Sequence, residues 1–218
     1  MHLKIQKAPK SWPVYRKGRK YIVKPRISVE KGVPILIVLR DILKVVQNRK
    51  EAKRVIHRKQ ILLNNKPVKD EKDGVLLFDI ITLIPLKKIY RLNLAKNKKI
   101  QVDEIKEKEA DYKIAKIIGK KVLKGKKTQL NLSDGRNFVS EIKCRINDSV
   151  LINFKKKKIE KCLALEKNSK AFVFAGKHAG EEGVVKKIDS EKKMAELNFK
   201  GKTINVLIKQ VMAVNKNE

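Results

Sequence analysis

The segment 48–59 constrains the fold more than any other part of the chain, because it pairs one thin apolar stripe with cations on its other faces. The stripe follows the i, i+3, i+4 spacing of a helix and consists of Ala52, Val55 and Ile56. Asn48 is suited to cap this helix, and Glu51 follows where a capping box has its acidic partner. The other faces carry Lys50, Lys53, Arg54, His57 and Arg58. The sequence predicts a short helix that is anchored on its back and presents cations on its front.

The flanking segments supply the anchor for this helix. Residues 34–47 repeat apolar side chains at helical spacing, which predicts an amphipathic helix whose polar side carries Arg40, Lys44 and Gln47. After the basic helix come a short apolar run at 61–63 and a turn at Asn64-Asn65, where asparagine tolerates a left-handed backbone. A longer strand is predicted at 75–84. We therefore expect helix, helix, strand, turn and strand in this order.

The charge of the chain narrows the choice of partner. The 218 residues contain 55 Lys and Arg against 23 Asp and Glu, a formal net charge of +32. Self-repulsion of this size opposes a compact state unless a polyanion neutralises it, and nucleic acid is the default polyanion for Lys and Arg. A membrane surface is the other anionic candidate, but no segment combines strong amphipathicity with Trp- or Phe-rich anchors. We therefore expect a nucleic-acid partner and no membrane.

Several other classes of protein are disfavoured by the sequence. No apolar run approaches the ~20 residues needed to cross a bilayer, and the N-terminus lacks the apolar core of a signal peptide. Cys144 and Cys162 belong to no Cys-x-x-Cys pair, so no metal site is expected. Two buried thiols are the favoured state, with a single disulfide as the alternative. We predict no cofactor and no small-molecule substrate.

Residues 1–33 interleave cations with aromatic residues and three prolines. The prolines discourage regular structure, so we interpret the segment as an extended basic arm. In this interpretation its cations contact phosphates, and Trp12 or a tyrosine stacks on a base or on the protein. The expected phosphate contacts are Arg16, Lys17, Arg19 and Lys20. The alternative is a flexible basic tail whose aromatic residues pack on a neighbouring domain, and for Trp12 this alternative is at least as well favoured.

The middle of the chain is interpreted as β-structure that follows a mixed connecting region. A strand is predicted at 90–94, and a short helix at 102–115 bears an acidic cluster that we interpret as a solvated face rather than as paired catalytic carboxylates. Asp134-Gly135 between two alternating runs predicts a hairpin, and a further strand is expected at 150–154. Residues 87–168 are therefore expected to form a central, mostly β domain.

Five short alternating runs fill residues 171–214 and predict a small SH3-like β-barrel. Between the first two lies the segment 176–183, whose glycines permit positive φ and a close approach of phosphate to the backbone. The flanking pattern is β, so a nucleotide site is disfavoured. Lys177 and His178 are the expected contact residues of this loop. Because His178 has no partner in the sequence, a loop contact or exposure to solvent is favoured over a metal ligand or a general base.

Two parts of the chain resemble RNA-associated modules. The predicted helices, strand and turn are similar to the alpha-L RNA-binding domain, and the residues that match its pattern are Arg40, Asp41, Arg49, Ala52, Ile56, Ile61, Leu63 and Asn64. The sequence departs from that pattern at Lys59 and Asn65, where the family has glycine. The segment 176–185 resembles the KOW motif, with Glu181-Glu182 where basic residues are common.

The order of arm, alpha-L unit, β unit and KOW unit resembles the S4e family of small-subunit ribosomal proteins of archaea and eukaryotes, and the compact length resembles the archaeal members. The matching segments are 2–4, 8–10, Trp12, 24–25, 34–41, 128–137 and 176–180. The resemblance implies an α+β, multi-domain chain. Its expected parts are an extended basic N-terminal arm at 1–33, a small α/β alpha-L (S4-type) RNA-binding domain at 34–86, the central β domain at 87–168 and a C-terminal SH3-like β-barrel (KOW) at 169–218.

The same resemblance implies a structural constituent of the small ribosomal subunit in the cytoplasm, with small-subunit rRNA and neighbouring small-subunit ribosomal proteins as partners. Such a protein would clamp rRNA helices by neutralising their charge. The first alternative is a transient ribosome assembly or rescue factor. A more distant one is an RNA-modifying enzyme, for which the remaining residues supply no catalytic domain. The expected RNA-binding residues are Arg16, Lys17, Arg19, Lys20, Arg40, Lys44, Arg49, Lys50, Lys53, Arg54, Arg58, Lys177 and His178.

Overall fold

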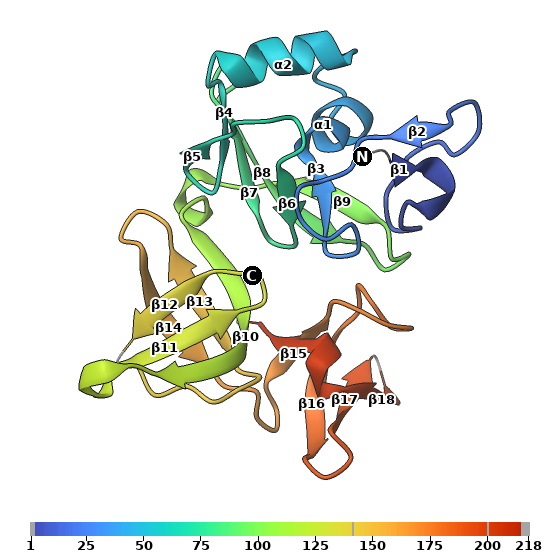
Figure 1. The fold of residues 1–218 in the computed structure, drawn as a ribbon. Coiled ribbons are helices and arrows are strands. Elements are labelled where there is room, and N and C mark those ends of the chain that lie inside the picture. The colour runs from blue at the N-terminus through green and yellow to red at the C-terminus, as the bar shows by residue number, and fades with distance from the viewer. Residues whose placement is uncertain (1–2, 141, 200, 215–218) are drawn as a thin grey trace. The chain divides into compact units, whose positions relative to one another are not determined.

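The chain forms two compact units in a computed structural model, Met1–Asp111 and Tyr112–Glu218. The structure describes residues 3–140, 142–199 and 201–214. Within these ranges the chain is mostly β with few helices, and each unit contains its own sheets (Figure 1). In the same ranges no helix is both long and apolar enough to span a lipid bilayer.

The first unit is built on a five-stranded antiparallel sheet in the order β5-β4-β7-β8-β9. Its strands are β4 (Ile61–Leu63), β5 (Lys66–Pro67), β7 (Ile80–Leu83), β8 (Lys88–Leu94) and β9 (Ile100–Glu104). Two smaller pairs accompany it, β1 (Leu3–Lys4) with β2 (Tyr21–Ile22) and β3 (Gly32–Pro34) with β6 (Gly74–Leu76). β8 and β9, which lie beyond residue 86, therefore pair into the sheet of the first unit.

Two short helical segments pack on the core of this unit. α1 (Ile35–Ile37) continues into a π-helical turn at Val38–Ile42, and the side chains from Ile35 to Leu39 are buried. α2 (Arg49–His57) buries Ala52 and Ile56. The core that they share also contains Trp12, Val33, Ile61, Val75, Ile81, Leu83 and Leu92. A helix of this length is marginal alone, so apolar burial is what holds α2 in place.

Asn48 caps the N-terminus of α2, as predicted. Its side-chain oxygen accepts a hydrogen bond from the backbone N–H of Glu51 at 3.0 Å. The Glu51 carboxylate accepts in turn from the N–H of Gln47 at 2.8 Å. Two N–H groups next to the first turn thus gain side-chain partners, which fixes the residue at which the helix starts.

Lys59 ends α2 in the left-handed backbone region, with φ 55°. The N–H of Lys59 donates to the carbonyl of Ile56 at 2.9 Å, and the N–H of Gln60 donates to the carbonyl of Val55 at 3.2 Å. This pair of bonds is a Schellman motif, in which the left-handed residue is most often glycine. Lys59 therefore adopts a left-handed conformation that glycine takes more easily.

The helix predicted at 34–47 is too long, because helical structure ends at Ile42. The N–H of Leu43 donates to the carbonyl of Val38 at 2.8 Å, which is the wider spacing of a π-turn. Lys44 then takes φ 54°, which stops any further helical turn. Apolar spacing predicts a helical face but not where that face ends, so the expected alignment of Lys44 with Arg40 is lost.

The single strand predicted at 75–84 is two strands in two different sheets, β6 and β7. Phe78, between them, has φ 60°. The carboxylate of Asp79 accepts hydrogen bonds from the backbone N–H of Leu76 at 2.7 Å and from the side-chain amide of Asn64 at 2.8 Å. The buried Asp79 thus turns the chain within an otherwise apolar run, and this local capping overrides the strand pattern.

The helix predicted at 102–115 is wrong. Val102 lies in β9 and pairs with Leu92 of β8, and only Glu107–Glu109 forms a single 3-10 turn. From Tyr112 the chain enters β10 (Tyr112–Val122) of the second unit. The helix was predicted from Ile105, Ala110 and Ile114, which are spaced by five and four residues. Ile100 and Val102 instead pack against the core of the first unit, and this packing favours a strand.

The first sheet of the second unit is five-stranded and antiparallel, in the order β12-β11-β10-β13-β14. Its other strands are β11 (Thr128–Leu132), β12 (Asn137–Ser140), β13 (Ser149–Asn153) and β14 (Lys158–Leu163). Gly135 turns between β11 and β12 with φ 83°, so the predicted hairpin is confirmed. The strand predicted at 150–154 is confirmed as β13.

The second sheet of this unit contains the five short strands predicted at 171–214, in the order β18-β17-β16-β15-β19. They are β15 (Lys170–Val173), β16 (Glu182–Asp189), β17 (Met194–Phe199), β18 (Lys202–Leu207) and β19 (Val211–Ala213). Their inward side chains form one core, which contains Ala171, Val173, Val185, Ala195, Leu197, Val206 and Val211. The remaining described helical segments are single 3-10 turns at Ile5–Lys7 and Ile208–Gln210, and the segment Lys124–Lys126 is a turn in which Gly125 has φ 77°.

Candidate nucleic-acid interface

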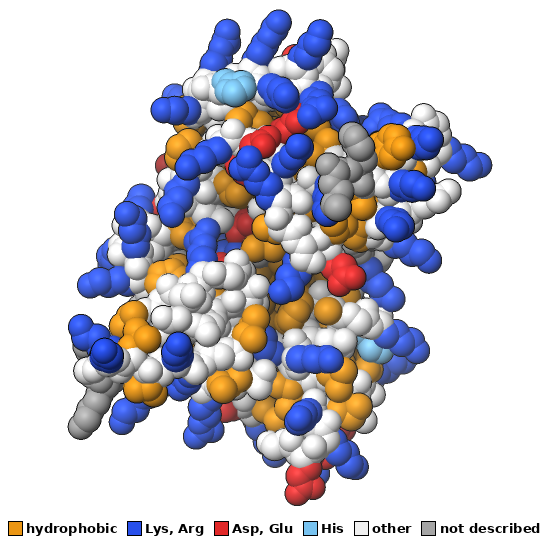
Figure 2. Space-filling model, viewed as in Figure 1, with side chains coloured by type: hydrophobic (Ala, Val, Ile, Leu, Met, Phe, Trp, Pro, Cys, Tyr) orange, Lys and Arg blue, Asp and Glu red, His pale blue; other side chains and the backbone are white. Residues whose placement is uncertain are grey.

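The front of α2 is a basic surface, which we call the α2 face and define as Lys50, Lys53, Arg54, His57 and Arg58. All five side chains are exposed. The opposite side of the helix is fixed, because Ala52 and Ile56 are 0% and 3% exposed. Figure 2 shows Lys and Arg side chains gathered with a histidine over α2 at the top of the view. A short helix whose back is buried in the core therefore presents several cations on one fixed side of its backbone.

Arg49 begins the same helix but has a different environment. Its guanidinium donates from Nε to both carboxylate oxygens of Glu71 at 2.8 Å, and from Nη2 to Glu71 Oε1. The Glu71 side chain is 2% exposed, whereas that of Arg49 is 55% exposed. The hydrogen bonds from Arg49 lower the pKa of Glu71 and raise the pKa of Arg49. The charge of Arg49 is therefore largely offset within the protein.

Arg40 and Lys44, the other predicted contacts of this region, differ from each other. Arg40 is half-buried and donates to the carboxylate of Asp41, with Nη2 at 2.7 Å from Oδ2. Arg19 lies 4.0 Å from the other oxygen of the same carboxylate. Lys44 is exposed in the left-handed residue after the π-turn. Of these cations, Lys44 has the fewest local constraints on reaching a phosphate.

The N-terminal segment is folded onto the first unit through part of its length. β1 pairs with β2, and Leu3, Ala8 and Trp12 are buried in the core. Trp12 is 2% exposed, so the alternative in which this ring packs on protein is confirmed. Lys17, Arg19 and Lys20 are exposed.

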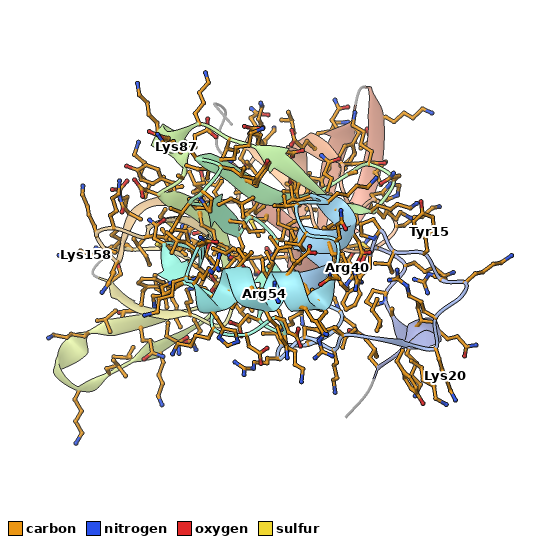
Figure 3. All side chains as sticks on the ribbon, turned by 90° about the horizontal axis from the view of Figure 1, so that it is seen from above. Tyr15, Lys20, Arg40, Arg54, Lys87 and Lys158 are labelled. Atoms are coloured by element: carbon orange, nitrogen blue, oxygen red, sulfur yellow. The ribbon has the colours of Figure 1, made fainter. Side chains whose placement is uncertain are left out.

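Arg16 holds the loop that carries these cations. Its Nη2 donates to the backbone carbonyls of Ala8 and Pro9 at 3.1 and 2.8 Å. Tyr15, which was not named among the expected contacts, is exposed beside it. In the sequence, Tyr15 could have been recognised as a candidate contact because it directly precedes the basic residues of segment 16–20. Figure 3 labels Tyr15 and Lys20 on this N-terminal segment and Arg54 on α2.

The loop between β15 and β16 contains the last two predicted contacts. Gly176 and Gly180 have φ 92° and 90°, which requires glycine-like freedom at both positions. Lys177 is exposed. His178 is half-buried, and its Nδ1 lies 3.4 Å from the Glu181 carboxylate. In the described ranges no group of three or more His, Cys, Asp or Glu side chains is placed to hold a metal ion.

Two lysines of β10 lie inside the second unit. The side chain of Lys113 is 2% exposed, and its Nζ lies 3.3 Å from the carboxylate of Asp134, whose side chain is 4% exposed. Lys116 donates from Nζ to the backbone carbonyls of Val211, at 2.7 Å, and of Ile208. Burial lowers the pKa of Lys116 to about 8. These two cations have a structural role. In the sequence, the only sign of their burial is that they lie among apolar residues of the same strand.

The two cysteines of the second unit are free thiols, Cys144 buried and Cys162 half-buried. Burial and the neighbouring Cys144 and Asp148 raise the pKa of Cys162 to about 12. The thiol form is therefore favoured over the reactive thiolate. Two buried thiols were the favoured expectation: both cysteines are free and Cys144 is buried, whereas Cys162 is only half-buried.

The fold and the surface together define a class of protein: a strongly cationic chain of two small, mostly β units with basic side chains presented from a fixed helix. The family described as Ribosomal family S4e matches residues 86–159, and the RS4NT (NUC023) domain matches residues 1–27. The small ribosomal subunit protein eS4 of Methanothermobacter thermautotrophicus is 36% identical over 191 residues, covering 86% of this chain and 79% of that relative. The chain belongs to the S4e family of ribosomal proteins.

Further comparisons agree with this assignment. The small ribosomal subunit protein eS4 of Nanoarchaeum equitans is 36% identical over 191 residues, covering 86% of this chain and 82% of the relative. The crystal structure of the 30S ribosomal protein S4e from Thermoplasma acidophilum has the same fold, with a TM-score of 0.73 at 22% identity. That match covers 86% of this chain and 96% of the other.

Proposed function

We propose that this protein is a structural constituent of the small ribosomal subunit in the cytoplasm, where it binds and clamps rRNA. The observation that carries the proposal is the α2 face, whose cations are exposed while the other side of the helix is locked into the core. Its relatives are named small ribosomal subunit proteins. Neighbouring small-subunit proteins are its further partners, and a structural role needs no catalytic site.

The mechanism is neutralisation of phosphate charge by cations held in place. Each Lys or Arg that contacts a phosphate releases condensed counterions, which favours binding and makes it depend on salt. Because α2 is capped at both ends and packed on one side, the backbone that carries these cations loses little freedom on binding. Two RNA segments that repel each other are held together when one cationic surface contacts both.

The proposed contacts follow from the environment of each cation. The strongest candidates for direct phosphate contacts are the exposed side chains of the α2 face, together with Lys17, Lys20, Lys44 and Lys177. Arg16, Arg19, Arg40, Arg49 and His178 already have partners in the protein, so we propose that they orient the surface and contact RNA with their remaining donors.

The modular assignment of the chain is also a proposal. We assign residues 1–33 to the arm, 34–86 to an alpha-L module, 87–168 to the central β module and 169–218 to a KOW module with an SH3-like barrel. The first two strands of the central module, β8 and β9, complete the sheet of the alpha-L module. The alpha-L assignment is supported by the order of α1, α2, β4 and the Asn64-Asn65 turn, where both residues have positive φ. The KOW assignment is supported by the five-stranded sheet β15–β19 and its glycine loop.

Sedimentation tests the function. Cell extract is run on a sucrose gradient in high salt, and fractions are probed for this protein. Stable co-sedimentation with the small subunit at one copy each is expected for a structural constituent. Release to the top of the gradient would favour a transient assembly or rescue factor, and an RNA-modification assay would then test the enzyme alternative.

A charge-removal variant tests the α2 face. Replacing Lys50, Lys53 and Arg54 by Ala, with Arg49 kept, should weaken binding to a small-subunit rRNA transcript about 10-fold or more and flatten its salt dependence. The control variant removes the same charge from β10 and from the loop before β11, with Lys120, Lys121 and Lys127 replaced by Ala. These side chains are exposed and lie outside the proposed contacts. Equal losses in the two variants would contradict a specific role for α2.

A further inference from the structure

Tyr15 has the most exposed large apolar side chain in the described ranges, at 89%. A ring of this size usually removes a large area from water by packing, so near-complete exposure calls for a partner. The other exposed aromatic residue, Tyr21, is 48% exposed and has the Lys20 ammonium 5.6 Å from its ring centroid. Trp12 is buried in the core. Tyr15 is therefore the aromatic side chain of this segment that is open to stacking.

The backbone on both sides of Tyr15 is tied to the first unit. The N–H of Val14 donates to the carbonyl of Trp12 at 2.9 Å, and the Trp12 ring lies in the core. On the other side, the Arg16 guanidinium donates to the carbonyls of Ala8 and Pro9. The ring is thus presented by an anchored segment, which lowers the entropic cost of ordering it against a partner.

The charge around Tyr15 selects the kind of partner. Residues 1–29 contain nine Lys and Arg and no Asp or Glu. Lys17, Arg19 and Lys20 are exposed within five residues of the ring. A partner must therefore offer negative charge close to a flat apolar face. Unpaired nucleotides offer both, because the base stacks on an aromatic ring while its phosphates meet the cations.

A membrane surface fits this loop less well. Residues 16–20, which follow Tyr15, are charged or glycine, so one tyrosine would be the apolar anchor of this stretch. Interfacial binding needs a broader apolar face than one ring supplies. A neighbouring protein would need an acidic rim matched to several cations around a single pocket.

We propose that Tyr15 stacks on an unpaired base of rRNA, with Lys17 and Lys20 on the flanking phosphates. This inference rests on the proposed ribosomal function and specifies one contact within it. The stacking contact is tolerant of base identity, because every base has a π-face. It also acts independently of charge, so removing the ring lowers affinity without changing the number of phosphates neutralised.

Titration of the full chain with single-stranded oligo(A) tests the contact. Tyr15→Ala should lower affinity about 10-fold, while the slope of log affinity against log salt stays as in the unmodified protein. Tyr15→Phe and Tyr15→Trp should restore the affinity, because both keep a flat ring, and Tyr15→Leu should not. Lys17→Ala is the electrostatic comparison and should reduce the salt slope. Tyr21→Ala is the matched ring control and should have a smaller effect.

Fluorescence locates the contact. Trp12 is the only tryptophan of the chain, and it is buried. Tyr15→Trp therefore adds an exposed fluorophore, whose emission should fall when oligo(A) stacks on it, whereas the emission of Trp12 alone should not change. A fully paired RNA duplex should leave both signals unchanged.

The outcomes separate this contact from the function on which it rests. If Tyr15→Ala binds oligo(A) within twofold of the unmodified protein, or Tyr15→Phe fails to restore binding, stacking is overturned. Quenching of Tyr15→Trp by acidic lipid vesicles or by an acidic peptide, but not by oligo(A), would overturn it in favour of those partners. If the unmodified protein fails to co-sediment with the small subunit in high salt, the ribosomal function itself fails.

Discussion

The buried carboxylate of Glu71 determines the role of Arg49. A carboxylate that is 2% exposed needs a partner, because the loss of its hydration is otherwise uncompensated. Arg49 supplies a guanidinium fork that contacts both carboxylate oxygens, and the nearby Lys53 also favours the charged form of Glu71. Arg49 therefore contributes mainly to the stability of the first unit, because its charge is largely offset by Glu71.

Removal of Arg49 should therefore destabilise the first unit. We expect Arg49→Ala to lower the free energy of unfolding at pH 7 by about 2–3 kcal/mol, because Glu71 is left buried and charged. Lys50→Ala, next to it on the exposed face, should change the free energy by no more than about 0.5 kcal/mol. Urea denaturation of both variants measures the difference.

Acid should reduce the effect of Arg49→Ala. Arg49 lowers the pKa of Glu71, so the stabilisation is complete above the ordinary carboxyl pKa of 4.5 and is lost as pH falls through the lower folded value. The deficit of the variant should therefore shrink as the protein is titrated toward about pH 3. A deficit that is unchanged across this range would show that packing, not the ion pair, is responsible.

At the scale of elements, the sequence predicted the ends of helices and strands where a nearby residue, such as a capping asparagine or a turn glycine, sets the end. The cap at Asn48 and the turn at Gly135 are such cases. The break at Asp79 depends on Asn64, which lies 15 residues away, and the pairing of Arg49 with Glu71 spans 22 residues. These contacts form only when the chain is folded. Helical spacing therefore predicted the α2 face, but not that the charge of the neighbouring Arg49 would be offset by Glu71.

Lys116 joins β10 to the end of the second sheet within its unit. Its ammonium donates to carbonyls at Ile208 and Val211 and lies 6.0 Å from the ring centroid of Phe174. The charged form makes these contacts at the cost of lost hydration, which is why its pKa is low. The strand thus contains an ionisable group at a position where an apolar residue would be usual.

The stability of the second unit should depend on pH above neutrality because of Lys116. Its folded pKa of about 8 lies below the ordinary 10.5, so between these values the unfolded chain binds more protons. The free energy of unfolding should therefore rise with pH in this window, by up to about 1.4 kcal/mol per pH unit from this group. Lys116→Met should lack this component. Identical pH profiles for the two proteins in chemical denaturation would contradict the assignment.

At the scale of the whole molecule, several acidic side chains form ion pairs with nearby arginines. Arg26 contacts Asp70 and Asp73, and Arg40 contacts Asp41, all within the first unit. The net charge of +32 leaves a large excess of cations beyond such pairs. Folding concentrates this excess and is opposed by mutual repulsion.

Salt should therefore stabilise the free protein. Added sodium chloride shortens the range of repulsion between exposed cations, so the Tm in differential scanning calorimetry should rise from low salt to physiological ionic strength. The variant with Lys120, Lys121 and Lys127 replaced by Ala should start from a higher Tm and respond less. A Tm that falls with salt would indicate that surface ion pairs dominate over repulsion.

Because each unit forms its own sheets, the first unit can fold while the chain is still being translated. In the described ranges every strand pairs with strands of its own unit, and the sheet of the first unit is complete at Glu104. A chain emerging from its N-terminus can therefore finish this sheet before any residue of β15–β19 exists, as domains generally fold in order of synthesis. The α2 face would then be formed on a nascent chain, so the protein could begin to engage RNA before its own translation ends.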